Sequence, residues 1–207
     1  MSRQLNHYPQ FVLEHPNPPV KLNFDDVFGR CAPVHIEIGS GKGTFLVNQA
    51  KSQLDANFIG SEWAGKFYRF AVDRIGRWNL GNVRIIRTDA VPYITECVPD
   101  SSIDCFHIYY PDPWPKKRHH RRRFFNSANT DQLIRALKPA GCIRVATDFA
   151  EYFEQIKEVL ASKADSLEQI DFLPNPGVQI GEWVGSNFER KYIKEKRQIY
   201  TIAVKKK

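Results

Sequence analysis

Residues 34–43 read VHIEIGSGKG, and this stretch decides the fold. Its first half, Val34 to Ile38, places β-branched residues at alternate positions, as a short strand does. Three glycines follow within five residues, and glycine tolerates the tight turns through which a backbone approaches a ligand closely. A helical pattern begins directly afterwards, at about Thr44. The stretch therefore predicts the first strand, glycine-rich loop and helix of an α/β domain.

The same alternation of patterns continues along the chain. Apolar, β-rich runs predict strands at 34–38, 57–63, 83–87, 103–110, 142–146 and 199–204. Apolar residues at helical spacing predict helices at 44–54, 64–78, 92–98 and 125–137, and another that starts at Phe149. The sequence KPAG at 138–141 is expected to end the helix before it, and a loop is expected at 174–185. This order indicates a doubly wound, mostly parallel sheet in residues 31–207, with an N-terminal arm at 1–30.

The basic charge of the chain is concentrated in two segments. The 207 residues carry a net charge of +7. Residues 116–123, KKRHHRRR, contain six Lys or Arg and no acid, and residues 189–207 contain eight Lys or Arg and two Glu. The rest of the chain is mildly acidic. Such concentration favours a polyanionic partner over general solubility.

Several classes of protein are not expected. No run of eighteen apolar residues occurs, so we expect no membrane span, and the N-terminus lacks the apolar core of a secretion signal. The four cysteines, Cys31, Cys97, Cys105 and Cys142, form no CxxC pair, so we expect no metal site. Buried, reduced thiols and a cytoplasmic location are the expectation.

An acidic residue lies in or directly after each of five successive predicted strands. Each acid alone is explained as a turn former or a helix cap. The carboxyl ends of parallel strands lie at one edge of the sheet, so the five together indicate a shared site. These residues are Glu37, Glu62, Asp89, Asp112 and Asp148.

The acids also indicate which cofactor is bound. Glu62 follows Gly41 by 21 residues, near the spacing of an acid that accepts hydrogen bonds from ribose hydroxyls. A dinucleotide needs positive charge for its pyrophosphate, whereas a carboxylate-rimmed pocket suits the sulfonium and ammonium of S-adenosylmethionine. We therefore predict S-adenosylmethionine as the cofactor. Its predicted contacts are Glu37, Gly39, Gly41, Glu62, Asp89 and Asp112.

Residues 109–123, YYPDPWPKKRHHRRR, combine a candidate catalytic acid with a basic run. Three prolines and a tryptophan make a rigid loop that can hold Asp112 in place at the end of a central strand. Six cations without an acid between them would repel one another on a bare surface, so the run after the loop predicts contacts with RNA phosphates. His119 and His120 face the RNA or have no functional role.

The motifs EIGSGKG, GSEW, RTDA, PDPWPKKRHHRRR, VATDF and SNFER occur in the order found in the bacterial tRNA (guanine-N7-)-methyltransferase family, which this chain resembles from about Val34 to its C-terminus. The resemblance implies a class I, Rossmann-like methyltransferase fold: a seven-stranded, mostly parallel sheet with its last strand antiparallel and helices on both faces. It implies methyl transfer from S-adenosylmethionine to N7 of guanine 46 in the variable loop of tRNA.

The resemblance also implies roles for individual residues. Asp112 resembles the active-site acid of the family. The positions that resemble substrate contacts are Lys116, Asp148, Ser186, Asn187, Phe188 and Glu189. The expected RNA-binding patch is Lys117, Arg118, Arg121, Arg122 and Arg123. Ser186 stands where the family usually has threonine, and it keeps the hydroxyl.

Guanine N7 already has a lone pair, so its methylation needs no base. We expect in-line attack on the sulfonium methyl, with Asp112 orienting the guanine. Two alternatives remain open: methylation of an exocyclic base amine, and nucleotide and RNA binding without catalysis. An NAD-dependent dehydrogenase is disfavoured by the acidic rim. The sequence does not distinguish a monomer from a homodimer.

Overall fold

The computed structural model describes residues 4–207. Its strands are β1 (Val34–Ile38), β2 (Asn57–Ser61), β3 (Val83–Ile86), β4 (Ile103–Tyr109), β5 (Leu137–Thr147), β6 (Leu167–Ile170) and β7 (Tyr200–Lys206). Its α-helices are α1 (Phe24–Phe28), α2 (Thr44–Ser52), α3 (Gly65–Trp78), α4 (Ala90–Pro92), α5 (Ser127–Ala136), α6 (Ala150–Ala161) and α7 (Asn187–Lys194). Short helical turns are η1 (Pro9–Phe11), η2 (Tyr93–Cys97) and η3 (Lys117–Arg122). The predicted α/β class is confirmed.

The strands form one sheet in the order β3-β2-β1-β4-β5-β7-β6. Neighbouring strands from β3 to β5 are parallel, whereas β7 is antiparallel to both β5 and β6. The seven-stranded sheet with a reversed last strand is therefore confirmed. The strand order reverses between β1 and β4, and ligands of open α/β sheets bind at the carboxyl ends of the strands at such a point.

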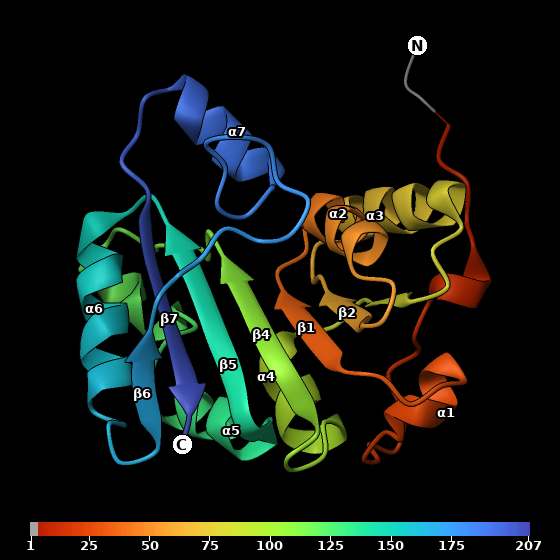
Figure 1. Cartoon of the computed structure of the whole chain (residues 1–207), viewed down its shortest axis with the longest axis horizontal. Coiled ribbons are helices and arrows are strands. Elements are labelled where there is room, and N and C mark those ends of the chain that lie inside the picture. The colour runs from red at the N-terminus through yellow and green to blue at the C-terminus, as the bar shows by residue number, and fades with distance from the viewer. Residues whose placement is uncertain (1–3) are drawn as a thin grey trace.

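Helices cover both faces of the sheet (Figure 1). On one face, α2 and α3 bury Leu46 and Ala71 against Ile85 of β3. On the other face, α5 and α6 bury Leu133 and Ile156 in a larger core. Each fully buried large aliphatic side chain contributes roughly 1.5–3 kcal/mol. In Figure 1, α7 lies above the upper ends of β4 and β5, and α2 and α3 lie to its right, beyond the upper end of β1.

The described part of the N-terminal arm packs along α3 and β3. Phe11 is buried with residues of α2 and α3, and Val12 forms a parallel bridge with Ile85 of β3. The amide of Leu13 donates to the carbonyl oxygen of Ile85 at 3.0 Å. The arm therefore covers the outer edge of β3, where an unpaired edge strand invites association with other chains.

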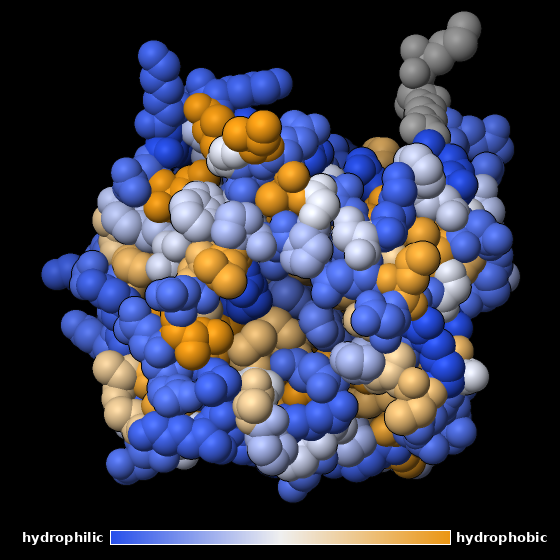
Figure 2. Space-filling view, in the orientation of Figure 1, coloured by the Kyte–Doolittle hydropathy of each residue, from blue (hydrophilic) through white to orange (hydrophobic). Residues whose placement is uncertain are grey.

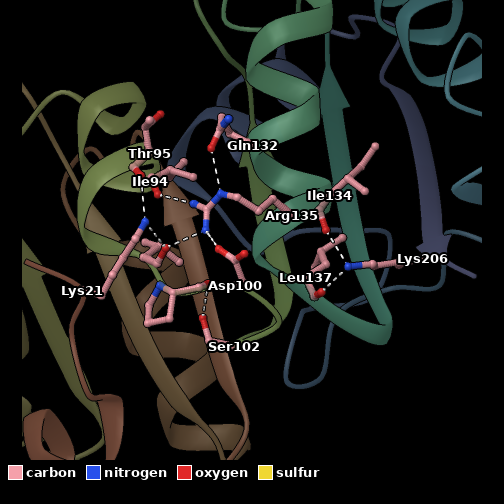
Figure 3. Close-up of polar contacts among 12 residues, drawn as sticks. Lys21, Ile94, Thr95, Asp100, Ser102, Gln132, Ile134, Arg135, Leu137 and Lys206 are labelled. Atoms are coloured by element: carbon pink, nitrogen blue, oxygen red, sulfur yellow. Dashed lines mark hydrogen bonds and ion pairs between the residues drawn. The ribbon is translucent and has the colours of Figure 1, made fainter.

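Arg135 of α5 and Lys21 of the arm meet at the end of η2 (Figure 3). Its guanidinium donates to the carbonyl oxygens of Ile94 (2.7 Å) and Val98 (3.0 Å), and it pairs with Asp100. Lys21 of the arm donates to the same Val98 oxygen at 3.0 Å. These cations satisfy carbonyl groups at the end of η2, where a helix leaves its acceptors unpaired.

Several segments differ from the prediction. Residues 138–141, predicted to stop a helix, lie within β5, because α5 already ends at Ala136. They bulge out of the β4–β5 pairing, in which Leu137 pairs with Ile103 and Cys142 pairs with Cys105. The sequence did not predict α1, β6 or α7. No helix among residues 4–207 is long and apolar enough to cross a membrane.

Gly76→Ala should destabilise the protein. A Cβ at this position would lie 2.1 Å from the ring of Tyr8, so either the arm or α3 must move. Overpacking of this kind costs about 1–3 kcal/mol, which exceeds the roughly 1 kcal/mol that alanine gains over glycine in a helix. Urea unfolding should show a lower free energy of unfolding.

Gly81→Ala is the matched control, because a Cβ at Gly81 meets nothing within 4 Å. Its stability should stay within about 0.5 kcal/mol of the original protein. Unchanged stability in Gly76→Ala would contradict the packing of Tyr8 on α3.

Candidate active site

Two joined hollows lie at the carboxyl ends of β1, β2, β3 and β4. The first hollow, about 560 Å³, includes Glu37, Thr44 and Lys42 in its wall. The second hollow, about 450 Å³, includes Glu62, Asp89 and Asp112. The residues that line both are Gly39, Gly41, Phe67, Tyr109, Tyr110 and Phe188. The site therefore forms at the sheet edge that the strand-end acids predicted.

Glu37 is a buried carboxylate in the wall of the first hollow. Its side chain is 5% exposed, and burial raises its pKa to about 8, while the Ser40 hydrogen bond lowers it and the Glu62 charge raises it. Within residues 4–207, its Oε2 atom has no hydrogen-bond partner. A buried acceptor without a partner is costly, so this atom fits a ligand cation such as the ammonium of S-adenosylmethionine.

Two neutral groups in the same wall are also available to a ligand. The Thr44 hydroxyl and the Tyr110 phenol are buried, and neither has a hydrogen-bond partner among the described residues. Burial, reinforced by the Glu189 charge, raises the pKa of Tyr110, which therefore stays protonated and can donate. Three polar groups without hydrogen-bond partners therefore surround one hollow. Their grouping indicates a site for a polar ligand more than it indicates packing defects filled with water.

The glycine loop is held by Glu62. Its two carboxylate oxygens accept from the amides of Gly41 and Ala64, each at 2.7 Å. Gly39 and Gly41 have φ of 76° and 55°, the left-handed region that favours glycine. Burial raises the pKa of Glu62, the two amides lower it, and Asp112 raises it. Glu62, predicted to bind the ribose, thus also shapes the glycine loop.

Asp89 and Asp112 complete the acidic rim of the second hollow. Asp89 caps α4, and its Oδ1 accepts from the amide of Val91 at 3.0 Å. Asp112 is exposed at the mouth of the hollow. Asp148 lines neither hollow; its carboxylate pairs with Arg197 at 2.8 Å. Four of the five predicted acids therefore line the two hollows.

Arg123 anchors the loop that carries Asp112. Its Nε donates to the carbonyl oxygen of Pro113 at 2.8 Å, and its terminal nitrogens donate to Gln155 (2.7 Å) and Glu151 (3.2 Å). The residue is only 3% exposed. The prediction that Arg123 contacts RNA phosphates is wrong, because the side chain turns inward and its donors are used within the protein.

The other basic residues of this segment remain on the surface. Lys116, Lys117, Arg118, Arg121 and Arg122 are exposed. The Arg122 guanidinium lies 4.9 Å from the centre of the Trp114 ring.

The two histidines of the segment have contacts within the protein. His119 meets the Trp114 ring edge-on at 5.9 Å, and His120 lies 3.5 Å from Glu151. These contacts give both residues a place in the packing of the loop.

The segment from Ser186 to Glu189 begins α7. Ser186 caps the helix, and its hydroxyl accepts from the amide of Glu189 at 3.1 Å. Ser186, Asn187 and Phe188 line the first hollow. Glu189 is fully buried and accepts from the amides of residues 183–185 at 2.6–3.1 Å. Its carboxylate therefore shapes the loop before α7, and it lines neither hollow.

A buried hydrogen-bonded chain supports this site from below. Asn175 donates to the Tyr109 hydroxyl (3.1 Å), which is hydrogen-bonded to Nδ1 of His107 (2.7 Å). Nε2 of His107 is in turn hydrogen-bonded to Nδ1 of His35 (3.1 Å). Burial lowers the pKa of His107 well below its ordinary value and that of His35 to about 4. The chain joins β1 and β4 to the loop before α7.

The prediction of no metal site rested on cysteine spacing, which cannot detect ligands from different strands. His35, Cys105 and His107 place their ligand atoms within 4.8 Å of one another, so they could hold a metal ion. The hydrogen bond between the two imidazoles, however, already uses their facing nitrogens. Cys105 also lies against Cys142 of β5, with 2.9 Å between the sulfur atoms.

The sequence missed several lining residues. Phe67 and Arg74 of α3 and Lys191 of α7 line the first hollow, as does Tyr110. The helical spacing of Phe67 and Arg74, seven residues apart, was the available signal. That spacing predicts that the two residues share a helix face, but it does not predict that they line a cavity.

Comparison with known proteins identifies the family. The profile of a family described as “Putative methyltransferase” matches residues 31–202. A relative from Alkalilimnicola ehrlichii is 33% identical over 204 residues, covering 97% of this chain and 84% of the relative. One from Thiobacillus denitrificans is 40% identical over 156 residues, covering 75% and 68%. One from Burkholderia pseudomallei is 35% identical over 201 residues, covering 96% and 73%. All three are named tRNA (guanine-N(7)-)-methyltransferase.

Solved structures agree on the fold. A 30S ribosomal A1408 methyltransferase from an uncultured bacterium has a TM-score of 0.59 at 16% identity, covering 89% of this chain and 92% of that one. An S-adenosylmethionine-dependent O-methyltransferase from Thermotoga maritima has a TM-score of 0.54 at 16% identity, covering 84% and 59%. At this identity the similarity concerns the class I methyltransferase fold alone. With the sequence relatives, it leads to one conclusion: the chain belongs to the tRNA (guanine-N7-)-methyltransferase family.

Proposed function

We propose that the protein transfers the methyl group of S-adenosylmethionine to N7 of a guanine in tRNA, at position 46 of the variable loop. The observation that carries the proposal is the buried, unpartnered Oε2 atom of Glu37 in a hollow continuous with three further strand-end acids. The names of the sequence relatives support the substrate. The reduced cysteines and a tRNA substrate support a cytoplasmic location.

The residues divide the work of binding the cofactor. Glu37 accepts a hydrogen bond from the ammonium group. Glu62 and Asp89 bind the ribose and the base, and the backbone of the loop from Gly39 to Gly41 contacts the cofactor closely. When bound, S-adenosylmethionine supplies an electrophilic methyl group on a positively charged sulfur. The carboxylates around the hollows stabilise that cation and disfavour an anionic dinucleotide.

Asp112 orients the guanine. Guanine N7 attacks with its own lone pair, so no residue has to remove a proton. A carboxylate at this position offsets the positive charge that develops on the purine. Positioning of well-oriented reactants can supply roughly 7–11 kcal/mol of a barrier. The rigid loop between Pro111 and Pro115, held by Arg123, keeps the carboxylate in place before RNA arrives.

The substrate residues take different roles in this proposal. Ser186, Asn187 and Phe188 form the wall against which the target guanine lies. Glu189 acts through the loop that it holds. Lys116 contacts a phosphate, and Asp148, paired with Arg197, orients substrate from outside the hollows.

The decisive experiment identifies the product. Incubation with labelled S-adenosylmethionine and unmodified tRNA, followed by nucleoside analysis, should give 7-methylguanosine, and a tRNA with adenine at position 46 should give none. Asp112→Asn should lower the rate by about 10²–10³, the typical cost of losing one charge-stabilising group. Asp131→Asn is the control, since this exposed acid pairs with Lys163. An N-methylated adenosine, or an unaffected Asp112→Asn, would contradict the proposal.

Cofactor binding should depend on pH through Glu37. Its pKa is raised to about 8, so the carboxyl group is protonated in most molecules at pH 6 and must ionise to bind a cation. Affinity for S-adenosylmethionine should rise by close to tenfold from pH 6 to pH 7, while the amino group of the ligand stays protonated. Calorimetry should show this rise in the original protein. Glu37→Gln should bind more weakly and with little dependence on pH; a persistent rise in this variant would assign it to another group.

The exposed and buried parts of the basic run should respond differently to neutralisation. Arg118→Gln with Arg121→Gln should weaken tRNA binding and reduce the slope of log K against log salt by about 1.4–1.8, without loss of stability. Arg123→Gln should instead lower the free energy of unfolding by about 2–4 kcal/mol, because it removes charged hydrogen bonds from a buried site. Salt-dependent binding and urea unfolding separate the two, and an equal effect of both variants on stability would contradict this division.

A further inference from the structure

One face of α3 carries aromatic and basic side chains in a line that starts at the two hollows. Phe67, Phe70, Arg74 and Trp78 follow one another at intervals of three or four residues, so they share one side of the helix. Phe67 lines both hollows and Arg74 lines the first. At a rise of 1.5 Å per residue, Trp78 lies roughly 16 Å further along the helix.

Two lysines from the neighbouring segment lie over the rings of this line. Lys42 of the glycine loop is 5.2 Å from the centre of the Phe70 ring, and Lys51 of α2 is 3.6 Å from that of Trp78. Trp78 is 56% exposed and Phe67 is 38% exposed. Both lysines are exposed as well. The aromatic rings therefore hold ammonium groups at the surface, where they remain accessible to a partner.

Within residues 4–207, neither of these two lysines forms an ion pair with an acid. The one acid of α3, Asp73, is buried and pairs with Arg77 at 2.9 Å. Lys66 and Arg69, on the adjoining exposed strip of the helix, form no ion pair with any residue in 4–207. Figure 2 shows the upper edge of the molecule, over α7 and α3, as mainly hydrophilic with hydrophobic side chains interspersed. A protein partner would need matching acids, whereas a nucleic acid supplies both phosphates and stackable bases.

We infer that this face of α3, from Phe67 to Trp78 with Lys42 and Lys51, is a second RNA-binding surface that receives an unpaired segment of the same tRNA. The inference rests on the proposed function. Bases stack on exposed aromatic rings, and phosphates pair with the cations beside them, a combination typical of proteins that bind single-stranded nucleic acid.

The position of this surface indicates a role different from that of the basic residues at 116–122. The α3 surface begins at Phe67, in the wall of both hollows, and leads away from them along the helix. On the opposite side of the strand ends, α7 contributes Phe188 and Lys191. RNA next to the target guanine is thus held from two sides, which keeps the guanine over the hollows.

The far end of the surface offers the cleanest test, because Lys51 and Trp78 lie outside both hollows. Lys51→Gln with Trp78→Ala should raise the KM for tRNA roughly tenfold, since one stacked base and one phosphate contact are lost. The salt slope of binding should fall by about 0.7–0.9. Affinity for S-adenosylmethionine should be unchanged.

Lys157→Gln is the matched control. Lys157 lies 5.5 Å from the centre of the Phe153 ring on α6, so it is also a lysine over an aromatic ring, and it belongs to the far edge of the sheet. Its KM and salt slope should equal those of the original protein. A photo-activated cross-linking residue at position 78 should attach to tRNA, and one at position 157 should not.

Each outcome separates this inference from the proposed function. If the original protein methylates tRNA but the Lys51 and Trp78 variant keeps its KM and salt slope, the α3 surface does not bind RNA. Cross-linking of position 78 to protein alone would also overturn the inference. If the original protein transfers no methyl group to tRNA, the proposed function fails, and RNA cross-linking at position 78 then tests the surface independently.

Discussion

The hydrogen bonds of Glu62 set the geometry of the whole site. One carboxylate at the end of β2 accepts from the amide of Gly41 in the glycine loop and from that of Ala64 at the start of α3. Charged hydrogen bonds of this kind are short and strong. They fix the loop that ends β1, and with it Glu37, against the first turn of α3, which carries Phe67. The cofactor walls and the proposed RNA surface on α3 thus share one support.

Charge is arranged in layers around this support. The deepest groups are carboxylates, which burial makes reluctant to ionise, as the pKa of Glu37 shows. Around them lie the cations of η3, α3 and α7. The outer layer attracts a polyanion from solution, and the inner layer stabilises a small cation. A site with only one of these layers would not attract both the anionic RNA and the cationic methyl donor.

The sequence predicted the elements whose signals are local. Strands rich in valine and isoleucine, the glycine loop, and the acids after successive strands all depend on residues close in the chain. Asp148 followed the same pattern but pairs with Arg197, which lies 49 residues later and could not be foreseen.

The missed features depend on long-range contacts. Glu168 and Gln169 give β6 a polar pattern, because only one end of this strand is buried. The sequence does not distinguish Arg123 from the other cations of the basic run, because the partners that bury it come from α6. The proposed RNA surface on α3 has no local signal in the sequence, because its cations are spaced along a helix and come partly from α2 and the glycine loop.

The anchoring of the 110–115 loop by Arg123 affects when conformational entropy is lost. Tyr110 and Trp114 adopt left-handed backbone conformations, with φ of 54° and 43°, which non-glycine residues rarely adopt without support. The buried guanidinium holds this segment as part of the folding reaction. Ordering one backbone residue costs about 1–2 kcal/mol. That cost is therefore met once, when the chain folds, and it does not recur each time a tRNA molecule docks and departs.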